Sequence, residues 1–318
     1  MSILTRGAAT LIKAATLVLP LLTRAAGTDS YAIPSAPGNY VRKVNVLGDA
    51  RTFRIHVPKN YDGSTALPII LAFHGTSASA SVLERETSFN EVADSAGFFV
   101  VYPEGFHRGW NIGDCCRYSF VKHKDETAFT LTMLSVLSRG LRIDTTRVYA
   151  TGYSDGGTLS MLLGCKVPSR ITAVASVSGT LFDPLPKCTL SRPLPVMIIH
   201  GTGDHNIPYE GKKGGPGYVR GNHHEYSAPD VASFWRQRNS CSTGPLLEKH
   251  GNVERVTYDC AAGRAKILFY TIYNGHHGWP GGGRGWIFSP KPPSDMAATD
   301  TIASFFLRYR IGDSPLTK

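Results

Sequence analysis

The feature that most constrains the fold is a series of apolar, β-branched runs separated by stretches of helical periodicity. Several runs are apolar at consecutive positions, as expected of strands covered on both faces. Strand and helix in alternation predict an α/β fold, with a mostly parallel, doubly wound sheet and helices on both faces. The runs are RTFRIHVP (51–58), LPIILAFHG (67–75), GFFVVYPEG (97–105), RVYATGYS (147–154), AVASVSG (173–179), LPVMIIHGTGD (194–204) and KILFYTIYNG (266–275).

Stripes of apolar residues at helical spacing lie between and after these runs. They are interpreted as core packing rather than as cofactor contacts. With 318 residues, 42% of them hydrophobic, and no linker dividing the middle, the chain is expected to hold one catalytic domain over residues 27–318. The stripes are Phe89, Val92, Ala93 and Ala96; Phe129, Met133 and Val136; and Ile302, Phe305, Phe306 and Tyr309.

Residues 1–26 have the layout of a signal peptide, with three cations, no acid and an apolar stretch over 14–22. That stretch is shorter than the roughly 20 residues that a membrane span needs, so no stable membrane insertion is expected. Cleavage near Ala25 or Ala26 would leave a secreted or periplasmic protein. The alternative is a basic N-terminus that stays on the protein.

The formal net charge is +10, and it falls to +7 without Arg6, Lys13 and Arg24. A basic surface attracts acidic polysaccharides, although a solvated surface without a partner is the simpler interpretation. The cations are scattered, and no recognition helix or RNP motif is present, so nucleic acid is not an expected partner.

Six cysteines, an even number, suit an exported protein with disulfides, and none has the CxxC spacing of a zinc site. The favoured pair is Cys241–Cys260, which closes a short excursion between a helix and the next strand. Cys165–Cys188 comes second. The adjacent Cys115 and Cys116 leave open a vicinal bridge, two free thiols, or a different pairing among all six.

One serine lies between two glycines in the segment Gly152-Tyr153-Ser154-Asp155-Gly156, which matches the pattern G-x-S-x-G. This short pattern is weak evidence by itself, and the elements expected on either side of it make it more specific. A strand precedes Ser154 and a helical run follows it, so the serine is expected on a sharp, strained turn where only glycine fits at the flanks. The alternative is an ordinary hydroxyl in a glycine-rich loop.

Two backbone N–H groups are expected to face a developing oxyanion near this serine. The N–H of Asp155 lies at the start of the following helix, where the helix dipole favours negative charge. The N–H of Thr76, after the strand that ends in His74 and Gly75, would complete the pair. We expect His74 to be structural, with its ring bonded to the loop backbone.

A serine hydroxyl needs a base, and the base needs a carboxylate that orients it. Asp204, after the strand at 194–204, is the candidate acid; its alternative role is capping a turn. His277 is favoured as the base over the adjacent His276, because Gly-Trp-Pro follows it. Polar loops after the serine, with no strand before them, hold His205, His223 and His224.

These segments together resemble secreted polyhydroxybutyrate depolymerase-like and feruloyl esterase-like proteins, which are α/β hydrolases. The resemblance covers residues 39–309 and implies Ser154 as nucleophile, Asp204 as acid, His277 as base, and the Thr76 and Asp155 amides as oxyanion donors. Its motifs, in order, are Tyr102-Pro103-Glu104-Gly105, Trp110-Asn111, the serine segment, His200-Gly201-Thr202 with Asp204, and His277-x-Trp279-Pro280.

Substrate contacts are expected from Trp110, Trp279 and His276, with the loop at 211–224 adding cations to an aromatic rim. The alternative is that the tryptophans are core and the loop only connects elements. His276 stands where the family often has glycine. Many polymer depolymerases carry a separate adsorbing domain and this chain stops after one terminal helix, so soluble esters or oligomers are expected rather than insoluble polyester.

The predicted function is that of a secreted serine carboxylic-ester hydrolase that works through an acyl-enzyme, needs no metal or cofactor, and acts as a monomer. Its expected substrates are aryl esters, sugar esters or hydroxyalkanoate oligomers. Two alternatives remain: an acyltransferase in which a sugar hydroxyl replaces water, and a catalytically silent protein that binds cell-wall polymer.

Overall fold

A computed structural model of the chain describes residues 33, 35–113, 118–183, 185–212, 224–241, 244–261, 265–283 and 292–312. The expected signal peptide at 1–26 lies outside these residues. None of the described helices is long and apolar enough to cross a membrane.

A single ten-stranded sheet forms the centre of the molecule, in the order β1-β2-β4-β3-β5-β6-β7-β10-β9-β8. Six neighbouring strands of this order run parallel, namely β4, β3, β5, β6, β7 and β10, and antiparallel strands flank them on both sides. The strands are β1 (Gly38–Val46), β2 (Asp49–Val57), β3 (Leu67–Phe73), β4 (Phe99–Pro103), β5 (Ile143–Tyr153), β6 (Ala173–Val177), β7 (Val196–Gly201), β8 (Leu246–His250), β9 (Val253–Cys260) and β10 (Ala265–Ile272).

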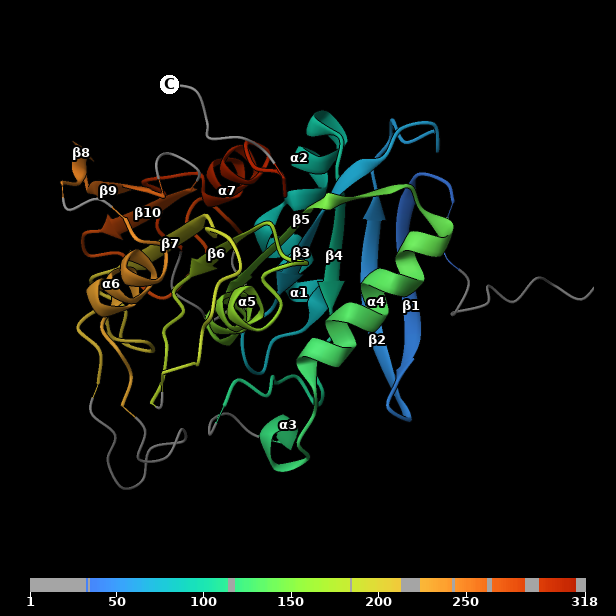
Figure 1. The fold of residues 1–318 in the computed structure, drawn as a ribbon, viewed down its shortest axis with the longest axis horizontal. Coiled ribbons are helices and arrows are strands. Elements are labelled where there is room, and N and C mark those ends of the chain that lie inside the picture. Colours follow the sequence, from blue (N-terminus) through green and yellow to red (C-terminus); the bar gives the residue numbers. More distant parts are fainter. Residues whose placement is uncertain are drawn as a thin grey trace, which may run out of the picture.

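Helices cover both faces of this sheet (Figure 1). Side chains of α4, α5 and α6 pack in the core on one face, and those of α1, α2 and α7 pack on the other. The predicted α/β architecture is therefore confirmed. The helices are α1 (Ala80–Thr87), α2 (Phe89–Ala96), α3 (Tyr118–Val121), α4 (Glu126–Gly140), α5 (Asp155–Lys166), α6 (Ala228–Arg238) and α7 (Ala298–Phe306).

The central strands are buried on both faces, as their continuous apolar runs predict. In β3, Ile69 and Leu71 point into one core while Ile70 and Ala72 point into the other. All five residues of β4 and of β6 are buried. Since the parallel strands end at the same edge of the sheet, the loops that follow β3, β5, β7 and β10 lie together there.

Edge strands were not predicted. β1 alternates between exposed and partly buried residues and joins β2 through a tight turn at Leu47 and Gly48, where φ is 52° and 92°. At the opposite edge, β8 is largely exposed. Such strands bury little apolar surface, so they lack the continuous hydrophobic run that marks the central strands.

Two disulfides confirm the two favoured cysteine pairings, Cys165–Cys188 and Cys241–Cys260. One detail differs from the expectation: Cys260 is the last residue of β9 rather than the start of the next strand, because the excursion contains the hairpin of β8 and β9. Cys115 and Cys116 lie outside the described residues.

The Cys241–Cys260 bridge closes a loop with a sequence separation of 19 residues. Replacing both cysteines by serine should lower the free energy of unfolding by about 3 kcal/mol, because the unfolded chain regains the entropy of the open loop. Denaturant titration of the oxidised protein measures this. In a reductant that opens both bridges, the difference between variant and parent should vanish; a difference that persists would contradict the cross-link explanation.

Candidate active site

Ser154 lies on the turn between β5 and α5 in a backbone conformation that L-residues rarely adopt, with φ 57° and ψ −124°. Its N–H donates to the carbonyl of Val177 on the neighbouring strand, at 2.8 Å, and its carbonyl accepts from Thr158 at 3.1 Å. These bonds from both sides hold the strained turn in place. The side chain is 7% exposed, at the edge of the sheet where the parallel strands end.

The flanking glycines are required by close packing. A Cβ at Gly156 would overlap the backbone oxygen of Phe73 at the end of β3, and one at Gly152 would overlap the backbone of Gly156. A Cβ at Gly75 would lie 3.2 Å from the Cβ of Ser154. The first turn of α5 therefore lies directly against the end of β3 and the loop that follows it, as the G-x-S-x-G pattern predicts.

His277 and Asp204 are in direct contact. The Nδ1–H of His277 donates to Oδ2 of Asp204 at 2.7 Å, while Oδ1 of Asp204 accepts the amides of Asn206 and Ile207, both at 2.9 Å. Burial alone would raise the pKa of Asp204, but the hydrogen bond and charge of His277 bring that pKa below its ordinary value. The carboxylate therefore stays ionised and orients the imidazole through its Nδ1.

Tyr153 connects this pair to the serine turn. Its ring lies 4.8 Å from the His277 ring, tilted by 39°, and its backbone directly precedes Ser154. Burial, together with the charges of Glu86 and Asp204, raises the pKa of Tyr153 far above its ordinary value, so the hydroxyl stays neutral. Sequence reasoning missed this residue, since the position before the serine in G-x-S-x-G carries no type requirement.

His200 lies next to Asp204, and the sequence assigns it no role beyond its place in a family motif. It is 1% exposed, its Nε2–H donates to the carbonyl of Ile207 at 2.8 Å, and Nε2 is 3.6 Å from Oδ2 of Asp204. Burial lowers the pKa of His200 more than the charge of Asp204 raises it. A neutral His200 thus packs on the carboxylate without competing with His277 for its charge.

The two predicted oxyanion residues touch each other. The hydroxyl of Thr76, in the loop after β3, donates to Oδ2 of Asp155, the first residue of α5. Asp155 is fully buried. His74 is also buried; its Nδ1–H donates to the carbonyl of Gly75 at 2.8 Å, and its Nε2 accepts the amide of Gly105 at 2.9 Å, so the ring bonds the loop backbone as expected.

The expected aromatic rim is wrong for both tryptophans. Trp110 and Trp279 are fully buried, and their indole N–H groups donate to the carbonyl of His74 and the hydroxyl of Thr299, at 2.7 and 2.9 Å. Both rings are core residues that support the loops of the site from inside, which is the alternative to the expected aromatic rim.

The histidine next to the predicted base faces outward. His276 is exposed, and its Nδ1 lies 3.2 Å from the carbonyl of Gly203. It remains a candidate for substrate contact. Most of the glycine-rich loop expected in the rim, residues 213–223, lies outside the described part of the chain and includes His223. His205, the residue after Asp204, is exposed.

Glu86, at the end of α1, is a buried acid that sequence reasoning missed. It is 6% exposed, and burial raises the pKa of its carboxyl to about 7. Its backbone carbonyl accepts the amide of Gly283 at 2.9 Å, which ties α1 to the segment after His277. No spacing in the sequence marks Glu86, because its environment arises only when α1 packs on that segment.

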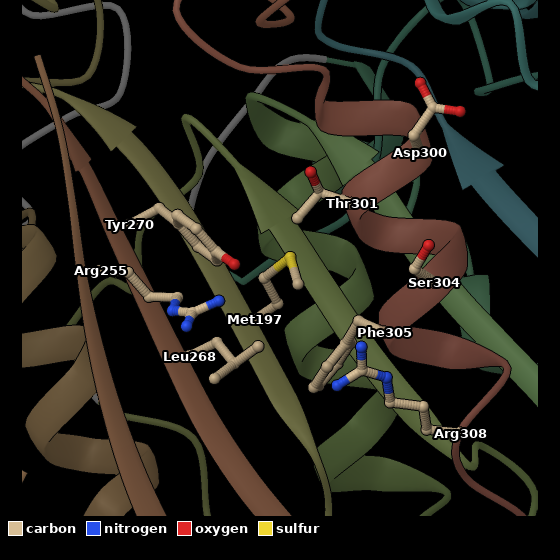
Figure 2. A pocket seen from close by; sticks show the side chains of 9 residues that line it. All are labelled: Met197, Arg255, Leu268, Tyr270, Asp300, Thr301, Ser304, Phe305 and Arg308. Atoms are coloured by element: carbon tan, nitrogen blue, oxygen red, sulfur yellow. The ribbon is translucent and has the colours of Figure 1, made fainter. Parts of the chain in front are cut away.

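Two cavities lie near different helices. One, of about 240 Å³, runs along α5 and is lined by Thr158, Leu162 and Lys166, which follow Ser154 at four-residue intervals, together with Leu181 and Phe182. The other, of about 350 Å³, lies between α7 and strands β7, β9 and β10 (Figure 2). Arg255 and Arg308 approach the second from opposite walls, and none of the predicted site residues lines it.

Sequence comparisons identify the chain's relatives. Residues 52–202 match the family model described as Esterase PHB depolymerase. The chain is 28% identical over 275 residues to the putative esterase NocK of Nocardia uniformis subsp. tsuyamanensis, covering 81% of this chain and 78% of that protein. It is 28% identical over 242 residues to feruloyl esterase B of Piromyces equi, covering 74% of this chain but only 44% of that protein.

Solved structures show the same fold. An acetyl xylan esterase from Aspergillus awamori superposes with a TM-score of 0.57 at 14% identity, over 84% of this chain and 98% of that one. An S-formylglutathione hydrolase from Agrobacterium tumefaciens gives 0.54 at 12% identity, over 87% and 97%. These likenesses confirm the predicted α/β-hydrolase fold, and the family match confirms the predicted resemblance.

The buried acid Glu86 yields a prediction about pH. Its pKa is 4.5 in an unfolded chain and about 7 in the fold, so the folded state holds its proton longer and stability falls as the pH rises from 4.5 to 7. Glu86→Gln should therefore raise the free energy of unfolding by up to about 3 kcal/mol at pH 8 and change it little at pH 4.5. Denaturant titrations at both pH values measure this.

The matched control is Glu91→Gln, which removes a carboxyl from the exposed surface of α2. This control should show no such difference between the two pH values. Equal effects of the two substitutions would contradict the assignment of a buried, protonated Glu86.

Proposed function

We propose that this chain, a carboxylic-ester hydrolase of the polyhydroxybutyrate depolymerase esterase type, cleaves its substrates through Ser154, His277 and Asp204. Two observations support the proposal: the hydrogen bond between His277 and Asp204, and the contact of the His277 ring with Tyr153, the residue before Ser154 on its strained turn. That combination supplies a nucleophile, a base with a free Nε2 and a carboxylate that orients it.

The reaction proceeds in two stages. As Ser154 attacks the ester carbonyl, Nε2 of His277 takes the hydroxyl proton and then gives it to the leaving alcohol, which leaves an acyl-enzyme. Water then attacks the acyl-enzyme, with His277 again as base, and the acid is released. Asp204, ionised throughout, stabilises the imidazolium that forms in both stages.

Negative charge on the carbonyl oxygen is stabilised by the backbone N–H groups of Thr76 and Asp155. The amide of Asp155 belongs to the first turn of α5, where the dipole of a helix favours an anion. The Thr76 loop lies against this turn because Gly75 lets its backbone approach Ser154. Donors that are already in place before the reaction stabilise the developing negative charge better than water does, because water molecules must first reorient.

Soluble esters with an aromatic or short aliphatic group are the proposed substrate class. The cavity along α5 is lined by Thr158, one helical turn after Ser154, and its apolar walls include Ile112, Leu162 and Phe182. Relatives named feruloyl esterase and acetylxylan esterase support aryl and sugar esters as the substrates to test first. Hydroxyalkanoate oligomers follow from the family model.

The proposed location of the protein is outside the cell or in the periplasm. It would have one catalytic domain over residues 27–318 after removal of the signal peptide. The two disulfides support this placement, because such bonds persist in oxidising compartments. Ordered elements from β1 to α7 contribute to one sheet and its covering helices, which supports a single domain.

Substituting the nucleophile tests the proposal directly. Ser154→Ala should lower kcat on a para-nitrophenyl ester by roughly 10⁴- to 10⁶-fold, and Asp204→Asn by about 10⁴-fold, with the fold unchanged. Ser304→Ala on the exposed face of α7 and His250→Ala on β8 are controls that should keep full activity. A Ser154→Ala variant as active as the parent would overturn the proposal.

A substrate panel separates the ester classes. Methyl ferulate, an acetylated sugar and a hydroxybutyrate oligomer are compared by kcat/KM, and the acyl products are analysed with a sugar acceptor present. Preference for one class identifies the acyl or alcohol group that the cavity along α5 accepts. Equal rates on all three would contradict a role for that cavity, and acylated sugar as the main product would favour the transferase alternative.

A further inference from the structure

The side chains of Thr76 and Asp155 join two parts of the chain that are 79 residues apart in sequence. Thr76 belongs to the loop after β3, and Asp155 is the first residue of α5. The hydroxyl of Thr76 donates to the carboxylate of Asp155, which is fully buried. These are the two residues whose backbone amides we assign to the oxyanion, so one side-chain contact links both donors.

The other side of the Thr76 loop is fixed independently. The carbonyl of His74 accepts the indole N–H of Trp110 at 2.7 Å, and the ring of His74 accepts the amide of Gly105 at 2.9 Å. The amide of Ser77 donates to the carbonyl of Arg108 at 2.9 Å. These contacts hold residues 74–77 against the segment after β4 but set no distance to α5.

The distance to α5 matters for the reaction. Oxyanion donors act at 2.7–3.1 Å from the oxygen, and a misplacement of about 1 Å can cost 10²-fold in rate. One donor belongs to the Thr76 loop and the other to α5, so the reaction depends on how these two segments are placed relative to each other. A hydrogen bond to a charged group, with its strong preference for distance and angle, restricts that freedom more than apolar contact does.

We propose that the Thr76 hydroxyl is a positioning group that fixes the two oxyanion amides relative to each other through the carboxylate of Asp155. The inference rests on the proposed function and adds a specific role for two side chains at that site. The carboxylate suits this role because it lies in the first turn of α5, where the helix dipole compensates its charge.

The test compares Thr76→Val, which keeps the shape but removes the hydroxyl, with Thr76→Ser, which keeps the hydroxyl. For Thr76→Val, kcat should fall by roughly 10- to 100-fold with KM nearly unchanged. The reason is that the two amides bind the carbonyl oxygen strongly only when negative charge develops on it. The affinity for a trifluoromethyl ketone, which forms a tetrahedral adduct on the serine, should fall by a similar factor. Thr76→Ser should stay within about threefold of the parent in both measurements.

Asp155 supplies the reciprocal test. Asp155→Asn keeps an acceptor for the Thr76 hydroxyl and should retain more activity than Asp155→Ala. In the double variant Thr76→Val with Asp155→Ala, the losses should not multiply, because both substitutions break one contact. If Thr76→Val does not fold, Thr76→Ala removes the same hydroxyl without adding a methyl group. Thermal unfolding midpoints report the integrity of each variant.

Two outcomes would overturn the inference: unchanged kcat in the variants that lack the hydroxyl, or a loss that Thr76→Ser shows equally. Labelling with a fluorophosphonate separates this failure from failure of the proposed function. If the parent is labelled at Ser154 and only the Thr76 predictions fail, the positioning role is wrong and the nucleophile stands. If Ser154 is not labelled, the proposed function itself is wrong.

Discussion

The close approach between the end of β3 and the first turn of α5 is the constraint on which the site depends. The backbone of Phe73 lies so near Gly156 that no side chain fits there, and Gly152 meets the same limit from the strand side. This contact forces Ser154 into its unusual conformation and brings the Thr76 loop against Asp155. The proposed nucleophile and the amides proposed to stabilise the reaction therefore depend on the same close contact.

Much of this arrangement could be predicted from the sequence, because it depends on backbone requirements that leave clear patterns. Fully buried strands such as β4 and β7 are continuous apolar runs, and a polar residue directly after such a run lies at the functional edge of the sheet. Asp204 and His277 were selected in this way, and the structure joins them by a hydrogen bond. Their catalytic roles stay predictions.

The parts that sequence could not supply depend on which side chains meet after folding. Tyr153 packs on the ring of His277, and His200 lies under Asp204, yet neither contact leaves a spacing that marks it in the chain. For Trp110 and Trp279 the sequence leaves two positions open, a substrate rim or the core. Position in a motif does not reveal whether an aromatic ring turns toward solvent or core, and both turn inward.

The bridge between Cys165 and Cys188 has a consequence for the position of Ser154. Cys165 is near the last residue of α5, and Ser154 immediately precedes the first, so the helix is tethered at one end by a covalent bond and at the other by the strained turn. Axial sliding of α5 would have to stretch one of these anchors. The bridge therefore stiffens the helix whose first turn follows Ser154, and a reduced chain would keep the hydrogen bonds of the serine turn but lose the covalent anchor at the far end of α5.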